Sequence, residues 1–382
     1  MARTLAKTNG KFMLLSALGI IMVVDAHSCN ALNMFTDFMP YNSFFMPLFV
    51  FISGYFNKVD SKTNLFEYFK RKLLHLILPY VLISLITAVL GFFIDWIKRG
   101  EHKSFLDEDL IINSLTRAML SGEVVAISSP LWFVPTLFGV LVIYALIKKI
   151  LVKWNSSLAF ILFCLINIFV VCLCKTTDYS IWLLPLLKCL FFLPFIEFGV
   201  LYREKIEKKT VKFKFGINIL VLSSLALINT VRMILLPKPN DIQFLDISTL
   251  SGFSSPYYTT PLVSSIIGIV FWVTLVEMIG SGIYENKIIN YISNNTFFIM
   301  GFHLLFMNMI NIVLAYINLN MIKLPEFDIN AYQESYWYRW YHWSFFSIVY
   351  FFAGLTGPLV LKYLFDRIKT MILGFVKTRK AI

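Results

Sequence analysis

The chain has 382 residues, of which 58% are hydrophobic and only 15% charged, against about 25% charged residues in a typical soluble domain. This composition excludes a soluble globular protein and predicts a membrane protein. The formal net charge of +12 does not indicate nucleic-acid binding, because the basic residues lie in short clusters between apolar runs rather than in one patch.

Ten apolar segments have about the length that a membrane-spanning helix needs, which is ~20 residues. In chain order they are 12–32, 41–57, 73–94, 132–150, 157–174, 181–201, 214–236, 261–280, 297–316 and 341–365. The second is short and contains Pro47. The sequence therefore predicts an all-α fold, a polytopic integral membrane bundle of about ten transmembrane helices. We expect a single domain over residues 1–382, with no appended soluble domain.

The distribution of lysine and arginine predicts the orientation, since cytoplasmic loops carry an excess of both. With the N-terminus in the cytoplasm, most of the 34 basic residues fall on the cytoplasmic side, in the segments 3–11, 58–72, 148–153, 203–214, 287 and 367–380. The N-terminal segment lacks a small-residue cleavage site, so we do not expect a cleaved signal peptide. The sequence predicts a multi-pass protein of the cell membrane with both termini cytoplasmic.

The first predicted helix carries two ionisable residues, Asp25 and His27, near its end. His27 lies roughly 24 Å from the start of the segment, toward the outer face. A charged side chain costs ~2.5 to 3.5 kcal/mol to insert in a membrane span, so such residues are functional candidates. The alternative is a neutral histidine hydrogen-bonded inside the bundle. Asp25 lies roughly 200° around the helix from His27, so a direct hydrogen bond is not expected, although the pair could sit in a broken turn.

The third predicted helix is preceded by Lys70, Arg71 and Lys72, and His75 follows within one turn. A basic helix start can bind phosphate groups through side-chain charge and through the free N–H groups of the helix. The alternative explanation is the positive charge that commonly flanks a span on its cytoplasmic side.

Two later helices carry isolated polar residues, Glu197 in the sixth and His303 in the inner half of the ninth. Each is a candidate cavity residue or a buried hydrogen-bond partner. The five cysteines lie in apolar stretches without zinc-type spacing, and we interpret them as core residues. The sequence contains no phosphate-binding glycine-rich loop, no metal-spaced set of His and Cys and no G-x-S-x-G motif, so no metal site is predicted.

The predicted outer segments 95–131, 237–260 and 317–340 are the longer ones, and loops of this length are usually functional or disordered. Two of them contain aromatic residues that we expect near the membrane surface: Tyr257, Tyr258, Tyr336, Trp337, Tyr338 and Trp340. These residues form either an interfacial aromatic belt or a platform for sugar rings.

Six stretches, in order along almost the whole chain, resemble the membrane-bound acyltransferase family 3. They are VVDAHS (23–28), MPLFVFISGYF (46–56), KRKLLHLILPY (70–80), SPLWFVPTLF (129–138), FFLPFIEFGVLYR (191–203) and NNTFFIMGFHL (294–304). Two positions depart from the family pattern. Ser16 stands eleven residues before His27, where the family usually has a basic residue, and Lys72-x-x-His75 replaces an Arg-x-x-Arg pattern.

The resemblance implies an enzyme that uses a cytoplasmic acyl-CoA, such as acetyl-CoA, as its donor. It implies that His27 is the catalytic base, with Asp25 beside it as a catalytic candidate. Lys70, Arg71 and Lys72 would contact the phosphates of CoA. The other donor-site candidates from the matching stretches are His75, Ser53, Trp132 and His303.

Two functions remain open at this point. The first is a membrane O-acyltransferase, in particular an O-acetyltransferase, that modifies a hydroxyl of a cell-surface polysaccharide or a glycolipid precursor. The second is a transporter or export partner for an envelope glycan, in which the polar groups line a path through the membrane. Both predict the lipid bilayer and an envelope glycan as partners, and neither involves nucleic acid. Acyl transfer by the purified protein would distinguish them.

Overall fold

The chain is described by a computed structural model over residues 2–60, 62–99, 127, 129–151, 155–176, 182–210, 214–235, 250, 257–280 and 282–379. Within these ranges it is helical and contains no strand, which confirms the all-α fold class. Nine helical segments of this described part are long and apolar enough to cross a membrane, and α2 is a shorter apolar helix. The bundle is therefore that of a multi-pass membrane protein.

The main helices correspond one to one to the ten predicted segments. They are α1 (Ala2–His27), α2 (Phe45–Phe56), α3 (Leu65–Lys72) with α4 (Leu78–Arg99), α7 (Phe133–Ile150), α8 (Ser156–Thr176), α9 (Leu184–Leu201), α11 (Phe215–Leu235), α12 (Thr260–Ile279), α14 (Thr296–Asn320) and α16 (Phe345–Arg379). The shorter elements are η1 (Tyr41–Ser43), η2 (Leu73–Ile77), η4 (Ser129–Trp132), η5 (Tyr202–Ile206), α10 (Glu207–Thr210), α13 (Lys287–Asn294) and α15 (Ile329–Glu334).

The third predicted helix is longer than expected because it begins before its basic cluster. Asn64 accepts hydrogen bonds from the backbone N–H groups of Phe66 and Glu67, and so caps the start of α3. The π-helical turn η2 then joins α3 to α4 in one continuous helix. Lys70, Arg71 and Lys72 therefore lie within a helix rather than in the loop before it.

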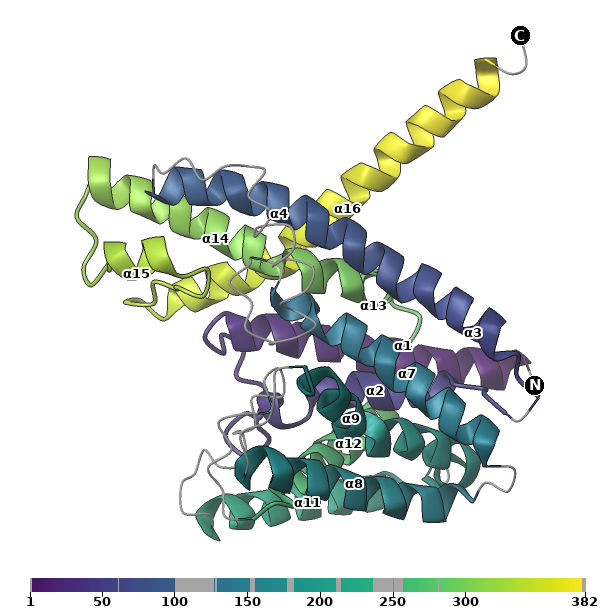
Figure 1. Ribbon diagram of the computed structural model, residues 1–382. Coiled ribbons are helices and arrows are strands. Elements are labelled where there is room, and N and C mark those ends of the chain that lie inside the picture. Colours follow the sequence, from purple (N-terminus) through teal and green to yellow (C-terminus); the bar gives the residue numbers. More distant parts are fainter. Residues whose placement is uncertain are drawn as a thin grey trace.

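Helix α1 lies between two groups of helices, as Figure 1 shows. One group contains α4, α14 and α16, and the other contains α8, α9, α11 and α12, with α2 and α7 near the middle. α1 packs against α2, α12, α13, α14 and α16. A polar side chain on α1 can therefore meet partners from both groups.

Helices α2 and α9 are in backbone contact at two glycines. A Cβ atom added to Gly54 would lie 2.0 Å from the carbonyl oxygen of Ile196, and one added to Gly199 would lie 2.1 Å from that of Phe51. Small residues allow this close approach, which is a common basis of helix packing in membranes. The contact fixes the position of the SGYF stretch that the family resemblance includes.

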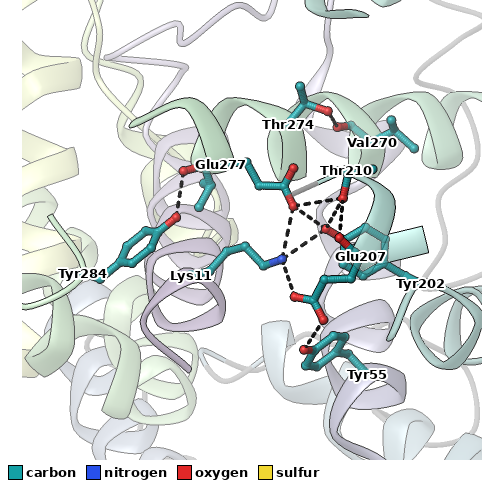
Figure 2. A network of polar contacts seen from close by, with 10 residues as sticks. Lys11, Tyr55, Tyr202, Glu207, Thr210, Val270, Thr274, Glu277 and Tyr284 are labelled. Carbon is teal, nitrogen blue, oxygen red and sulfur yellow. Dashed lines mark hydrogen bonds and ion pairs between the residues drawn. The ribbon is translucent and has the colours of Figure 1, made fainter. Parts of the chain in front are cut away.

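An ion network anchors the first half of α1, as Figure 2 shows. The Lys11 ammonium lies 2.8 Å from Glu207 of α10 and 3.2 Å from Glu277 of α12. Tyr202 donates to Glu277, and Tyr55 donates to Glu207 at 2.6 Å. Each carboxylate therefore has a tyrosine hydrogen bond in addition to its contact with the lysine. The network ties α1 to α2, η5, α10 and α12.

Candidate active site

The C-terminus of α1 presents His27 at the last helical position. The N–H of Asn30 donates to the carbonyl of Asp25 at 3.0 Å, and Cys29 has the positive φ of 63° that is typical of a Schellman helix end. The helix therefore stops immediately after His27 by a specific hydrogen-bonded turn. Its side chain is half-buried and points into the bundle toward α14.

His27 is paired with His303 of α14. His27 Nδ1 lies 2.7 Å from His303 Nε2, and the two ring planes are 5° apart. His303 is fully buried, and its Nδ1 lies 3.1 Å from the carbonyl of Ile299 and 3.0 Å from that of Met300. Both nitrogens of His303 and Nδ1 of His27 therefore have hydrogen-bond partners.

These partners determine which nitrogens carry protons when both rings are neutral. Carbonyl oxygens only accept hydrogen bonds, so Nδ1 of His303 must be protonated and its Nε2 must be an acceptor. His27 Nδ1 consequently donates to His303, and His27 Nε2 keeps its lone pair. Among the described residues no hydrogen-bond partner occurs for that nitrogen. The arrangement presents an imidazole ready to take a proton, with its other nitrogen held by a second ring.

Asp25 does not share this hydrogen bond, as the helical spacing predicts. Its Oδ1 accepts the N–H of Leu32 at 2.8 Å, and its side chain is fully buried. Asp25 holds the chain that follows α1 in place, and a catalytic role for it stays a prediction.

The contact between the two histidines brings the first half of α14 next to the last turn of α1. The sequence placed His303 in the inner half of its helix and His27 toward the outer face, yet their side chains touch. The reason is the short helix α13, which packs along α1 and precedes α14. α14 therefore begins part of the way along α1, and only seven residues separate its start from His303.

Arg339 is a site residue that the sequence did not indicate. Its guanidinium is buried and donates to the carbonyls of His27, Tyr336 and Tyr338, at 3.2, 3.0 and 2.6 Å. Burial lowers the pKa of Arg339 to about 10, so it remains a cation at neutral pH. A cation at the C-terminus of α1 is favourable because it offsets the negative end of the helix dipole.

Trp337 completes the surroundings of His27. Its ring lies edge-on to the imidazole of His27, with 5.0 Å between the ring centroids. Of the aromatic residues singled out in the sequence, those of the 336–340 segment therefore lie at the site. Tyr257 is exposed, and Tyr258 lies under the ammonium of Lys175. The predicted outer segments 95–131 and 237–260 fall largely outside the described residues.

The basic cluster lies on α3, away from the histidine pair. Lys70 and Arg71 are exposed, and Lys72 is half-buried with its ammonium 5.4 Å from the ring centroid of Tyr68. His75 is exposed and donates from Nδ1 to the carbonyl of Arg71 at 2.7 Å. π-helical turns such as η2 are frequent at functional sites.

Helix geometry gives the separation between the cluster and the histidines. Ile83 of α4 packs against Gly301 of α14, two residues from His303. Ile83 is eleven residues beyond Lys72, about 17 Å at the α-helical rise. The basic cluster and the histidine pair are therefore too far apart for one small group to touch both.

Three further polar residues lie inside the bundle. Trp132, at the end of η4, has the ammonium of the buried Lys188 5.4 Å from its ring centroid. Ser53 is half-buried on α2, beside the glycine contact with α9. Glu197 accepts a hydrogen bond from Tyr144, which confirms its interpretation as a buried hydrogen-bond partner.

The interpretation of the cysteines as core residues is wrong for Cys29, which is exposed in the turn after α1.

Comparison with known proteins gives one match. A family model described as "Acyltransferase domain" matches residues 14–367, which includes His27, the basic cluster, His303 and Arg339. No curated protein and no solved structure matches the chain.

Proposed function

Because the chain belongs to the acyltransferase 3 family, and is thus a membrane acyltransferase with an acyl donor and an acceptor, we propose that His27 is its general base. The donor in this proposal is an acyl-CoA, in particular acetyl-CoA. The acceptor is a hydroxyl of a cell-surface polysaccharide or of a glycolipid precursor. The observation that carries the proposal is the set of contacts around the two histidine rings, which assign a lone pair to His27 Nε2 and give it no partner within the described residues.

In the proposed reaction, His27 Nε2 first takes a proton from the acceptor and then gives it to the leaving group. The acceptor hydroxyl gives its proton to His27 Nε2 while its oxygen bonds to the acyl carbon. The carbon–sulfur bond of the thioester then breaks, and the imidazolium returns the proton to the leaving thiolate. The products are an ester and a free thiol. His303 accepts from Nδ1 throughout and stabilises the imidazolium, so it is a positioning residue.

The donor binds, in this proposal, through its phosphates to Lys70, Arg71 and Lys72. These side chains are exposed or half-buried at one end of a continuous helix whose other part passes close to His303. A separation of about 17 Å suits a donor with a long flexible arm between its phosphates and its thioester. Ser53, Trp132 and His75 remain candidates for contacts along that arm, and Asp25 for a catalytic contact.

The proposed orientation places both termini and the basic cluster in the cytoplasm, and the 336–340 segment outside. A membrane-impermeant thiol reagent should then label cysteines introduced at exposed positions of 321–344 in intact cells. It should not label those introduced in 62–72. The reverse pattern would contradict the orientation and, with it, the delivery of the acyl group from inside.

The reaction is tested by mass spectrometry of the surface glycan from cells with and without the protein. We expect ester-linked acyl groups in the first preparation only, restored by the wild-type chain and not by His27→Gln at equal abundance. Near-normal acylation by His27→Gln would exclude the proposed base. Glycan that is unmodified in both preparations but differs in amount at the surface would favour the export function instead.

A further inference from the structure

A pocket with a volume of about 410 Å³ lies in the segment between α14 and α16. Its walls include Glu326, Asp328, Trp337, Arg339, Tyr341 and His342. This volume falls within the range of small-molecule sites, about 300 to 1,000 Å³. The pocket reaches the active site, because Trp337 and Arg339 also contact His27.

Side-chain hydrogen bonds fix the backbone that forms the pocket. Asn308 donates to the carbonyl of Tyr336 and Asn311 to that of Tyr338, at 2.9 and 2.8 Å. Lys98, at the end of α4, donates to the carbonyl of Ser335 at 3.2 Å. Side chains of α14 and α4 therefore hold the segment in place, as expected of a preorganised site.

The chemistry of the walls combines exposed aromatic rings with hydrogen-bonding groups. Trp337 and Tyr341 are 45% and 65% exposed. The carboxylate of Glu326 lies 3.0 Å from His342 Nδ1, and the phenol oxygen of Tyr338 accepts the N–H of Asp328, which leaves the phenol proton to donate. The pocket thus offers apolar ring faces, carboxylate acceptors and hydroxyl donors in one hollow.

An aromatic belt at the membrane surface would not have this composition. Belt residues turn amphipathic rings toward lipid headgroups, and carboxylates such as those of Glu326 and Asp328 are costly in contact with lipid. A pyranose ring has the matching chemistry, because its C–H faces pack on aromatic rings and its hydroxyls both donate and accept. Acidic and basic groups are both present in the walls, so no excess of positive charge favours an anionic sugar.

We infer that this pocket binds one uncharged pyranose unit of the acceptor, and that Trp337 guides a hydroxyl of that unit, or of the next one along the chain, to His27 Nε2. The inference rests on the proposed acyl transfer and adds the place and the chemical class of the acceptor. It assigns Trp337 and Tyr341 as sugar-binding residues.

The test measures sugar binding and acyl transfer separately. The probe is a set of neutral oligosaccharides released from the unacylated envelope glycan of cells that lack the protein. Full-length protein is titrated with this probe in the absence of donor, and transfer from radiolabelled acetyl-CoA is then measured. We expect Tyr341→Ala and Trp337→Ala to weaken binding and raise the KM for the oligosaccharide about tenfold or more, with the KM for acetyl-CoA unchanged.

A matched control is Phe345→Ala, since Phe345 is 64% exposed, close to the value for Tyr341, but does not line the pocket. It should leave both KM values unchanged. Glu326→Gln, which keeps the shape of the wall, should weaken sugar binding without reducing protein abundance. His27→Gln should bind the probe as wild type does while its transfer rate falls by about 10²- to 10⁴-fold.

The outcomes separate the two proposals. Transfer that is unaffected in Tyr341→Ala and Trp337→Ala would overturn the pocket and leave the acyltransferase mechanism in place. Binding of the probe by the wild type without transfer, lost in the two variants, would support the pocket and contradict the mechanism. Binding that is as weak in Phe345→Ala as in Tyr341→Ala would overturn the pocket, because a general change of the segment would then explain it.

Discussion

The two ends of α1 carry polar clusters that use their hydrogen-bonding groups in opposite ways. At the Lys11 end, the ammonium and both carboxylates have partners, and the network joins five elements: α1, α2, η5, α10 and α12 (Figure 2). At the His27 end, both nitrogens of His303 and one nitrogen of His27 are hydrogen-bonded, and Nε2 of His27 has no partner in the part of the chain that the structure describes. A cluster in which every charged group has a partner holds a structure together, whereas a cluster that leaves a basic nitrogen open can do chemistry.

Burial alone does not distinguish the clusters, since Lys11 and His303 are both buried within the bundle. The difference lies in what the supporting residues do. Tyr55 and Tyr202 add hydrogen bonds to charges that already have a counter-ion. Arg339 and His303 instead fix the backbone and the tautomer of one side chain. If the Lys11 cluster is structural and the His27 cluster catalytic, substitutions at the first should change stability and substitutions at the second should change the rate.

The largest effect is expected for His27→Gln in the transfer assay. Glutamine keeps hydrogen-bonding groups but cannot accept a proton at neutral pH. General acid–base catalysis typically contributes 10²- to 10⁴-fold, so the rate should fall by about that factor, while abundance and donor binding stay normal. A rate within a few-fold of wild type in well-folded protein would show that the His27 end is structural as well.

The Lys11 end should respond in stability rather than in rate. Lys11→Met leaves Glu207 and Glu277, whose side chains are 16% and 10% exposed, without their cation, and breaking a buried pair on one side costs up to about 3 to 5 kcal/mol. We expect a large loss of folded protein in thermal unfolding, with the rate per folded molecule unchanged. Replacing both glutamates by Gln in the same chain should recover part of the stability. An equal loss of rate per folded molecule would contradict the comparison.

The sequence predicted most of this bundle because each long helix is an uninterrupted apolar run. It did not predict α13, whose eight residues are too few and too polar to signal a span, so the alignment of His303 with the end of α1 was not foreseen. His27 was found because an ionisable residue in an apolar run is conspicuous. The same reasoning applied to the lone lysine in LPLLKCLFF would have identified Lys188.

Arg339 could not be found in this way. It lies between aromatic residues in a predicted loop, where a cation is ordinarily solvated, and only the packing of the loop onto α1 buries it. The pairing of His27 with His303 joins residues 276 positions apart, so it too depends on the tertiary arrangement.

His303 gives a smaller, more specific prediction than His27. In His303→Ala the Nδ1 proton of His27 loses its acceptor, so the ring is free to turn or to change tautomer, and misplacement of a catalytic group by about 1 Å can cost on the order of 100-fold. The loss should appear in kcat, with both KM values little changed. His303→Gln supplies a carbonyl oxygen as a substitute acceptor and should recover part of the rate. A loss confined to the donor KM would favour the predicted donor-binding role of His303.

The smallest effect is expected for the basic cluster on α3. Exposed charges contribute about 1 kcal/mol or less each, so changing Lys70, Arg71 and Lys72 together to Gln should raise the donor KM by about tenfold. The acceptor KM should not change.

The dependence on salt is a second measurement of the same contact, because screening weakens the attraction between exposed charges and phosphate. Raising the ionic strength should increase the donor KM of the wild type and have little effect on the variant. Changing Lys205, Lys208 and Lys209 to Gln removes the same charge from exposed positions elsewhere and is the matched control. If both triple variants raise the donor KM equally, the α3 cluster acts only through net charge, and the donor site must lie elsewhere along the path to His27.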